Sequence, residues 1–104
     1  MNERIQNLAQ IDRVIHEPVR LMILMILEGV EEADFLYLLR EGGFTQGNLS
    51  SHLARLEEAG YVGIEKKFKG KFPLTVCRLT PEGKRALAGY SETLVAALQP
   101  RRER

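Results

Sequence analysis

The polar side chains that follow Thr45 are the residues of this chain best suited to chemistry, and their chemistry is hydrogen bonding. Glutamine and asparagine can pair with adenine in the major groove of DNA, and serine and histidine can donate or accept hydrogen bonds there. The side chains of these types between positions 45 and 58 are Gln46, Asn48, Ser50, Ser51 and His52. They fit a helix that contacts DNA bases, and they fit equally well an ordinary surface helix whose polar residues face water.

The segment that carries these side chains is predicted to be an amphipathic helix. Thr45 has a hydroxyl that can cap the helix by accepting a backbone N–H bond. Leu49, Leu53 and Leu56 follow at spacings of four and three and form one apolar stripe. The polar side chains point away from this stripe or lie on its shoulders, and Gly60 is expected to close the helix.

A cationic segment follows directly after this helix. Apolar residues recur over 62–68 and again over 74–79, which predicts two strands joined by the turn Lys69-Gly70-Lys71. A charge run is usually a solvated face, and lysines on edge strands also discourage aggregation. The position of this cationic segment directly after a capped helix favours contact with DNA phosphates. The cations assigned to this contact are Lys66, Lys67, Lys69, Lys71 and Arg78.

Four further helices are expected to support this helix and ribbon. The first lies near residues 2–15, the second runs from Pro18 to a stop at Gly29, the third ends at Gly42-Gly43, and the last covers roughly 81–98. The run Leu21–Leu27 leaves almost no polar face, so its helix should sit in the centre of the core. Acidic residues at 31, 32 and 34 suit the positive end of the third helix.

The two terminal helices predict a homodimer. Both are amphipathic, and a core of this size need not absorb both apolar stripes. The alternative, that both helices fold back on their own core, stays open. The residues assigned to the dimer interface are Ile5, Leu8, Ile15, Leu87, Tyr90, Leu94 and Leu98. A basic tail is expected from Pro100 to Arg104.

Composition limits the classes of protein that fit. The chain has 104 residues and a formal net charge of +1, which suits one domain. Residues 1–59 carry five Lys/Arg against ten Asp/Glu, whereas residues 60–104 carry ten against four. The positive half contains the ribbon and the tail, so an anionic partner fits better than a basic one.

Several functions are not expected from this sequence. Cys77 is the one cysteine, so the chain can form neither an internal disulfide nor a cysteine zinc cluster, and this thiol is predicted to be a buried small hydrophobe. His16 and His52 lack ligand spacing, so no metal or cofactor is expected. No phosphate loop or nucleophile motif indicates an enzyme. Without a signal-peptide pattern or an apolar run that could span a bilayer, a cytoplasmic location is expected.

Three segments, HEPVRLMILMIL, TQGNLSSHLARLEEAGYV and LTPEG, together resemble small winged helix-turn-helix transcriptional regulators of the MarR-like family, with ArsR-type regulators as cousins. The resemblance covers residues 16–85. It implies an α+β, mostly α, fold with a two-stranded wing. Together with the terminal helices, we expect one domain over 1–104 that combines a DNA-reading part (16–80) with dimerisation helices (1–15 and 81–99). The resemblance also implies a homodimer that binds double-stranded DNA at a pseudo-palindrome and regulates transcription. We expect this regulator to act as a repressor.

The resemblance assigns DNA contacts to particular positions. Those in the helix are Gln46, Asn48, Ser50, Ser51, His52 and Arg55, and those in the wing are Lys67, Lys69, Lys71 and Arg78. The residues themselves add Thr45 at the start of the helix and Lys66 in the wing to the expected DNA contacts. One departure from the ArsR-type metal sensors is that the single cysteine lies in a wing strand. Two other hypotheses remain: a protein-interaction module without DNA binding, favoured by the acidic first half and by Glu57-Glu58, and a regulator that responds to an unknown small-molecule effector.

Overall fold

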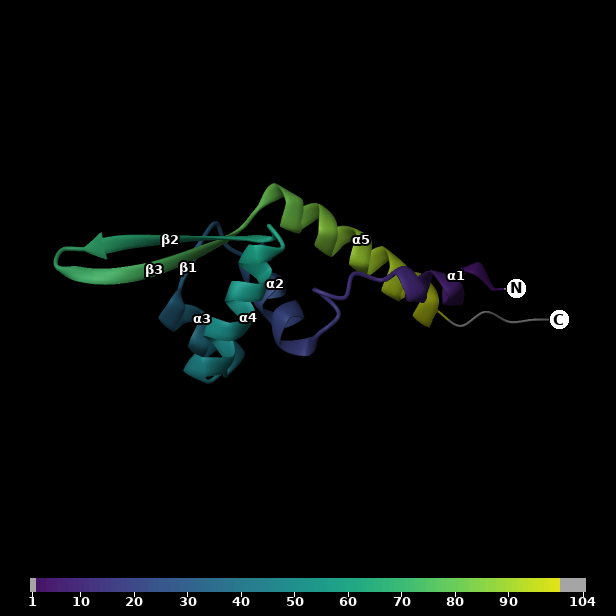
Figure 1. Ribbon diagram of the computed structural model, residues 1–104, viewed down its shortest axis with the longest axis horizontal. Helices are drawn as coiled ribbons and strands as arrows, with labels where there is room; N and C mark the ends of the chain where they lie inside the picture. The colour runs from purple at the N-terminus through teal and green to yellow at the C-terminus, as the bar shows by residue number, and fades with distance from the viewer. Residues whose placement is uncertain (1, 100–104) are drawn as a thin grey trace.

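The computed structural model describes residues 2–99, and the predicted basic tail lies outside them. The chain forms a mostly helical α+β domain in which a long two-stranded wing extends from one side and helix α5 runs out from the other (Figure 1). The elements in chain order are α1 (Glu3–Gln6), the 3-10 helix η1 (Asn7–Gln10), α2 (Pro18–Glu28), β1 (Ala33–Asp34), α3 (Phe35–Gly42), α4 (Gln46–Glu58), β2 (Val62–Lys69), β3 (Phe72–Leu79) and α5 (Pro81–Leu98).

Helices α2 and α4 begin and end at the residues that the sequence indicated, and α3 ends where it was expected to end. Pro18 occupies the first position of α2, where its missing N–H would be unbonded in any case. The side chain of Asp34 caps α3, which ends at Gly43 in the left-handed conformation that favours glycine. Thr45 caps α4 by accepting the backbone N–H of Asn48. The predicted starts and ends of α2 and α4 and the predicted end of α3 are confirmed.

The core joins the helices to the sheet. Its members are Ile15, Ile23, Leu24, Leu27, Ala33, Leu38, Leu49, Leu53, Leu56, Val62, Cys77, Leu87 and Tyr90. Helix α2 contributes Ile23, Leu24 and Leu27, but Met22 and Met25 are 41% and 60% exposed. The expectation that α2 would be buried all round is therefore wrong, because no neighbouring helix among the described residues covers its methionine side.

The sheet has three antiparallel strands in the order β1-β3-β2, whereas the sequence predicted two. The added strand, β1, pairs Ala33 with Cys77 and Asp34 with Val76. A strand of two residues is too short to produce a periodic signal, so only the tertiary pairing reveals it. The wing itself is continuous from the pair Val62 and Leu79 to the pair Lys69 and Phe72, and Gly70 makes the turn.

The N-terminal helix is much shorter than the predicted 2–15. Helix α1 has four residues and passes into a 3-10 helix, after which Ile11 is extended. The Asp12 carboxylate accepts the backbone N–H groups of Val14 and Ile15 at 2.9 and 3.1 Å. A short polar side chain that bonds nearby N–H groups competes with the helix, which explains why the apolar spacing was misleading.

Helix α5 follows its prediction and anchors both ends of the domain. Its cap Thr80 accepts the N–H of Gly83 at 2.9 Å and donates its hydroxyl to the carbonyl of Gly60 at 2.7 Å. At the other end, the Arg4 guanidinium donates to the carbonyls of Ala96 and Gln99, both at 3.1 Å, and so ties α1 to α5. Within residues 2–99, no helix is long and apolar enough to cross a membrane.

Candidate nucleic-acid interface

Helix α4 presents a continuous polar face to solvent. Leu49, Leu53 and Leu56 are 0–3% exposed and pack against the core, which fixes the orientation of the helix. The exposed positions are Thr45, Gln46, Gly47, Asn48, Ser50, Ser51, Ala54, Arg55, Glu57 and Glu58. Side chains on this face are small near the start of the helix, so another molecule can approach its backbone closely there.

His52 differs from the other predicted contact residues of α4, because its ring faces helix α2. Its Nδ1 atom lies 3.1 Å from the Arg20 guanidinium, which donates the hydrogen bond, and its Nε2 atom lies 3.5 Å from the Glu17 carboxylate. The guanidinium of Arg20 also donates to the carbonyl of Val14. His52 therefore ties α4 to the start of α2, a role that its polar character alone did not reveal.

Arg55 lies on the exposed face and is half-exposed. Its guanidinium is 3.4 Å from the carboxylate of Glu58, one helical turn further along. Exposed ion pairs of this kind contribute about 0–1 kcal/mol, so the pair leaves the Arg55 side chain free to move to another anion.

Two of the five wing cations belong to a charge cluster at the base of the wing. Arg78 lies 2.9 Å from Glu65 and 3.2 Å from Glu32, and Lys67 lies 3.9 and 3.6 Å from the same two carboxylates. The hydrogen bond from Arg78, together with the charge of Lys67, lowers the pKa of Glu65 below its ordinary value. Two cations and two anions give this cluster no net charge.

Sequence reasoning assigned Glu32 to the wrong neighbour. It was expected to favour the N-terminus of α3, but Asp34 fills that position and Glu32 contacts the wing. Glu32 and Arg78 are 46 residues apart in the sequence. Strand β1 brings them together, so the cluster depends on the strand that the sequence did not predict.

The other three wing cations have no carboxylate partner among the described residues. They are Lys66, Lys69 and Lys71, all of them exposed, and two of them flank the turn at Gly70. The net positive charge of the wing therefore lies toward its tip, where no acidic residue follows Glu65 before the end of β3.

The residues predicted for a dimer interface fall into two groups. Ile15, Leu87 and Tyr90 are 0–6% exposed and belong to the core of the single chain. Leu8 and Leu94 are half-buried, while Ile5 and Leu98 are 57% and 70% exposed. Val95, which the prediction omitted, is 52% exposed. Its position three residues before Leu98 on the same helix could have indicated it.

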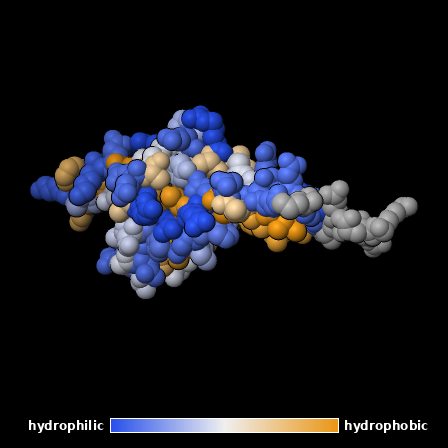
Figure 2. All heavy atoms as spheres, turned by 45° about the vertical axis from the view of Figure 1, so that its right-hand side comes forward, coloured by the Kyte–Doolittle hydropathy of each residue, from blue (hydrophilic) through white to orange (hydrophobic). Residues whose placement is uncertain are grey.

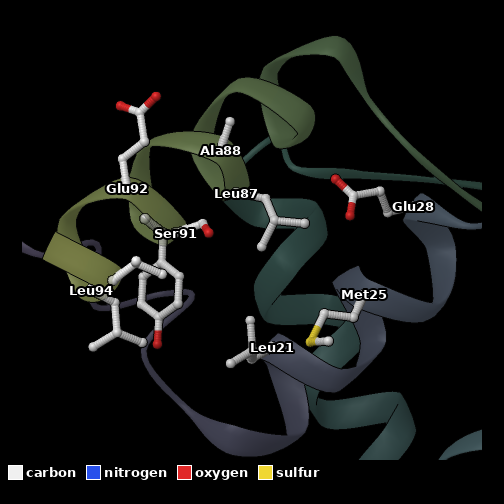
Figure 3. A pocket seen from close by; sticks show the side chains of 10 residues that line it. Leu21, Met25, Glu28, Leu87, Ala88, Ser91, Glu92 and Leu94 are labelled. Atoms are coloured by element: carbon white, nitrogen blue, oxygen red, sulfur yellow. The ribbon is translucent and has the colours of Figure 1, made fainter. Parts of the chain in front are cut away.

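An open groove of about 490 Å³ lies between α2 and α5. Leu21, Met25 and Leu87 point into it from the two helices, while the carboxylates of Glu28 and Glu92 lie at its edges (Figure 3). The groove is mainly apolar, and it continues along α5 to the exposed Val95.

The remaining candidates for chemistry lie away from this surface. Cys77 has no exposed surface, and burial raises the pKa of its thiol to about 11, so the predicted structural role agrees with its position. His16 contacts the Tyr90 hydroxyl through Nδ1 at 3.0 Å. Among residues 2–99 no group of three His, Cys, Asp or Glu side chains could hold a metal ion.

Comparisons with known proteins agree with this architecture. An uncharacterized protein of Methanocaldococcus jannaschii is 37% identical over 79 residues, which are 75% of this chain and 85% of that protein. A solved transcriptional regulator homologue from Pyrococcus horikoshii OT3 has a TM-score of 0.84 at 28% identity and covers 93% of this chain and 95% of its own. The transcriptional repressor BigR from Xylella fastidiosa has a TM-score of 0.64 at 26% identity and covers 94% of both chains.

A match to a family model assigns the chain to a family more directly than these single proteins do. The family described as winged helix DNA-binding domain matches residues 19–98, from the start of α2 to the end of α5. Solved MarR- and ArsR-family transcriptional regulators share the same fold. Winged-helix regulators of this kind are normally not enzymes. The chain belongs to the winged helix DNA-binding domain family and resembles transcriptional regulators.

Proposed function

We propose that this chain is a homodimeric regulator of transcription that binds double-stranded DNA at specific sequences and acts as a repressor. One observation carries the proposal: a capped helix, α4, lies next to the wing. The exposed face of α4 is polar with small side chains, and the distal lysines of the wing have no carboxylate partner among the described residues. A helix fits the major groove, and a cationic ribbon can lie along the neighbouring phosphates.

Base discrimination is assigned to the exposed face of α4. Gln46, Asn48 and Ser51 are exposed and carry hydrogen-bonding groups, and Ser50 and Arg55 lie beside them. Each good bidentate contact discriminates against a wrong base by about 1–3 kcal/mol. His52 acts indirectly in this scheme, because its contacts with Arg20 and Glu17 hold α4 at a fixed position on α2.

Phosphate contact is assigned mainly to Lys66, Lys69 and Lys71. Each phosphate that a cation neutralises releases condensed counterions and steepens the dependence of affinity on salt. Lys67 and Arg78 already face Glu32 and Glu65, so they contribute less to this dependence.

The dimer contact is assigned to α1 and the second half of α5. Hydrophobic residues gather on one side of this projecting end (Figure 2). The most exposed apolar side chains on these two helices are Ile5, Val95 and Leu98. Leu94 of α5 and Leu8 of the adjoining η1 are half-buried. Contiguous exposed apolar surface of this kind marks interaction sites. A two-fold dimer would set its reading helices about 34 Å apart, or at another spacing given by the dimer.

The test is a selection from random duplex DNA at two salt concentrations, with sequencing of the bound fraction and light scattering to measure the mass of the free protein. The proposal expects a dimer, enrichment of an inverted repeat, and an affinity that falls steeply with salt. A transcription assay on a promoter that contains the enriched repeat then tests repression.

Binding without sequence enrichment would contradict site-specific regulation. A monomer at micromolar concentration would contradict the assigned interface. Retention of protein partners at high salt, without any DNA binding, would favour the protein-interaction module instead.

A further inference from the structure

Two aromatic side chains near the wing tip are almost fully exposed. Phe68 is 73% exposed and Phe72 is 76% exposed, although aromatic rings usually lie in cores or interfaces. Figure 2 shows hydrophobic residues among hydrophilic ones at the end of the wing. Removing an exposed ring from water is favourable, so each ring is a candidate for contact with another molecule.

The two rings lie on opposite faces of the wing. Ile64, Lys66 and Phe68 alternate along β2 and therefore share one face. Ile64 lines a hollow together with Ser50 and Ala54 of α4, so this face is the one turned toward α4. Phe72 pairs with Lys69 across the ribbon, and its side chain belongs to the other face.

Lys66 and Phe68 thus extend the surface of α4 along the wing. A duplex that lies against the exposed face of α4 would run past this face of the wing before it reaches the tip. The Lys66 ammonium is exposed and has no carboxylate partner among residues 2–99, so it suits the phosphates on that side. Phe68, one pleat further out, offers an apolar ring where an adjacent groove presents its sugars.

We infer that Phe68 packs against the deoxyribose edges of the minor groove next to the site occupied by α4. The inference rests on the proposed DNA binding and adds an apolar, salt-independent contact to it. Apolar side chains of DNA-binding proteins contact the minor groove in this way, and some insert between base steps. Phe72, on the opposite face, points away from the duplex in this arrangement, whereas Lys69 beside it reaches a phosphate past the edge of the ribbon through its flexible four-carbon stem.

The experiment compares Phe68→Ala with Phe72→Ala. The two variants remove the same side chain at nearly the same exposure and from the same part of the wing, so they differ mainly in the face affected. Each is titrated by fluorescence anisotropy against the duplex that the wild-type protein selects, at four salt concentrations. Thermal melting should be nearly unchanged in both, because neither ring is buried.

The expected result is a loss of affinity of about tenfold for Phe68→Ala and less than twofold for Phe72→Ala, from the area that one ring would bury. The slope of log K against log salt should stay at the wild-type value in both variants, because no charge is removed. Phe68→Leu should keep most of the affinity, since leucine also buries apolar area.

Equal affinities for Phe68→Ala and the wild-type protein would overturn the inference and leave the proposed function intact. Equal losses in the two alanine variants would overturn the assignment to one face. Failure of the wild-type protein to bind any duplex would overturn the proposed function, and the inference with it.

Discussion

The salt dependence of DNA binding should follow the distribution of ion pairs in the wing. Lys69 and Lys71 flank the tip and have no carboxylate partner among the described residues, whereas Lys67 lies 3.6 Å from Glu32 and 3.9 Å from Glu65. Replacing both tip lysines by alanine should weaken binding to specific and unrelated duplexes alike. Each phosphate contact contributes about 0.9 to the slope of log K against log salt, so the double variant should lose about 1.8 per wing and about 3.6 per dimer.

Lys67→Ala is the matched control for the tip lysines. It removes the same charge from the wing, but it leaves Arg78 as the one cation of the cluster beside Glu32 and Glu65, so the cluster becomes negative by one charge. Those carboxylates repel phosphates, so affinity should fall while the change in slope stays smaller than for a tip lysine. Glu32→Gln has the opposite effect: Glu65 remains beside Lys67 and Arg78, the cluster becomes positive by one charge, and both affinity and slope should rise.

The assay is fluorescence anisotropy with a labelled duplex between about 50 and 200 mM salt, a range over which several phosphate contacts change affinity by orders of magnitude. An unchanged slope in the double variant Lys69→Ala/Lys71→Ala would remove the wing from the binding mechanism. A slope that changes as much for Lys67→Ala as for one tip lysine would show that the charge cluster opens when DNA binds.

Three further predictions concern stability and reactivity. Gly83→Ala should lower the free energy of unfolding by at least about 2 kcal/mol in urea titrations, because a Cβ at this position overlaps the Tyr61 carbonyl. Gly89→Ala on the same helix is the control: its Cβ meets open space, so it should not destabilise the protein. The hydrogen bond from the Tyr61 hydroxyl to Asp12, together with burial, raises the pKa of Tyr61 to about 12. The contribution of this hydroxyl to the free energy of unfolding is therefore complete below pH 10 and is lost as the pH rises from 10 to 12. Tyr61→Phe should lower the free energy of unfolding by about 1 kcal/mol at pH 7, and the stability of this variant should fall less between pH 10 and 12 than that of the wild-type protein. Cys77, with a thiol pKa of about 11, should resist iodoacetamide at pH 8 until the protein unfolds, and rapid alkylation of the native protein would contradict its burial.

The sequence predicted the elements whose signals are local. Thr45 and Thr80 cap α4 and α5 as expected, Pro18 starts α2, and Gly43 ends α3, because caps and helix breakers depend on neighbours within one turn. The leucine stripe of α4 also fixed which face of that helix is exposed. The same rules failed at the N-terminus, where the Asp12 carboxylate bonds backbone groups that a longer helix would use.

The sequence predicted which helix and strands form the candidate site, but it did not predict which residues pair with the charged side chains there. Residue types alone placed His52 and Lys67 among DNA contacts, and the structure adds their partners in α2 and beside β1. Likewise, Leu87 and Leu98 both belong to the apolar stripe expected for α5, yet Leu87 is buried in the core and Leu98 is 70% exposed. Periodicity identifies a face, but it does not say how far along the helix the core extends.

The sequence by itself determined the order of helices and strands, the exposed face of α4 and the cationic ribbon, because each follows from propensity, capping and periodicity over a few residues. Only the tertiary structure decided that Glu32 reaches Arg78 across 46 residues, that β1 joins the sheet, and that Phe68 and Phe72 occupy opposite faces of the wing. These features depend on strand register and on contacts between distant segments, and a local pattern carries no information about which distant segment a side chain will meet.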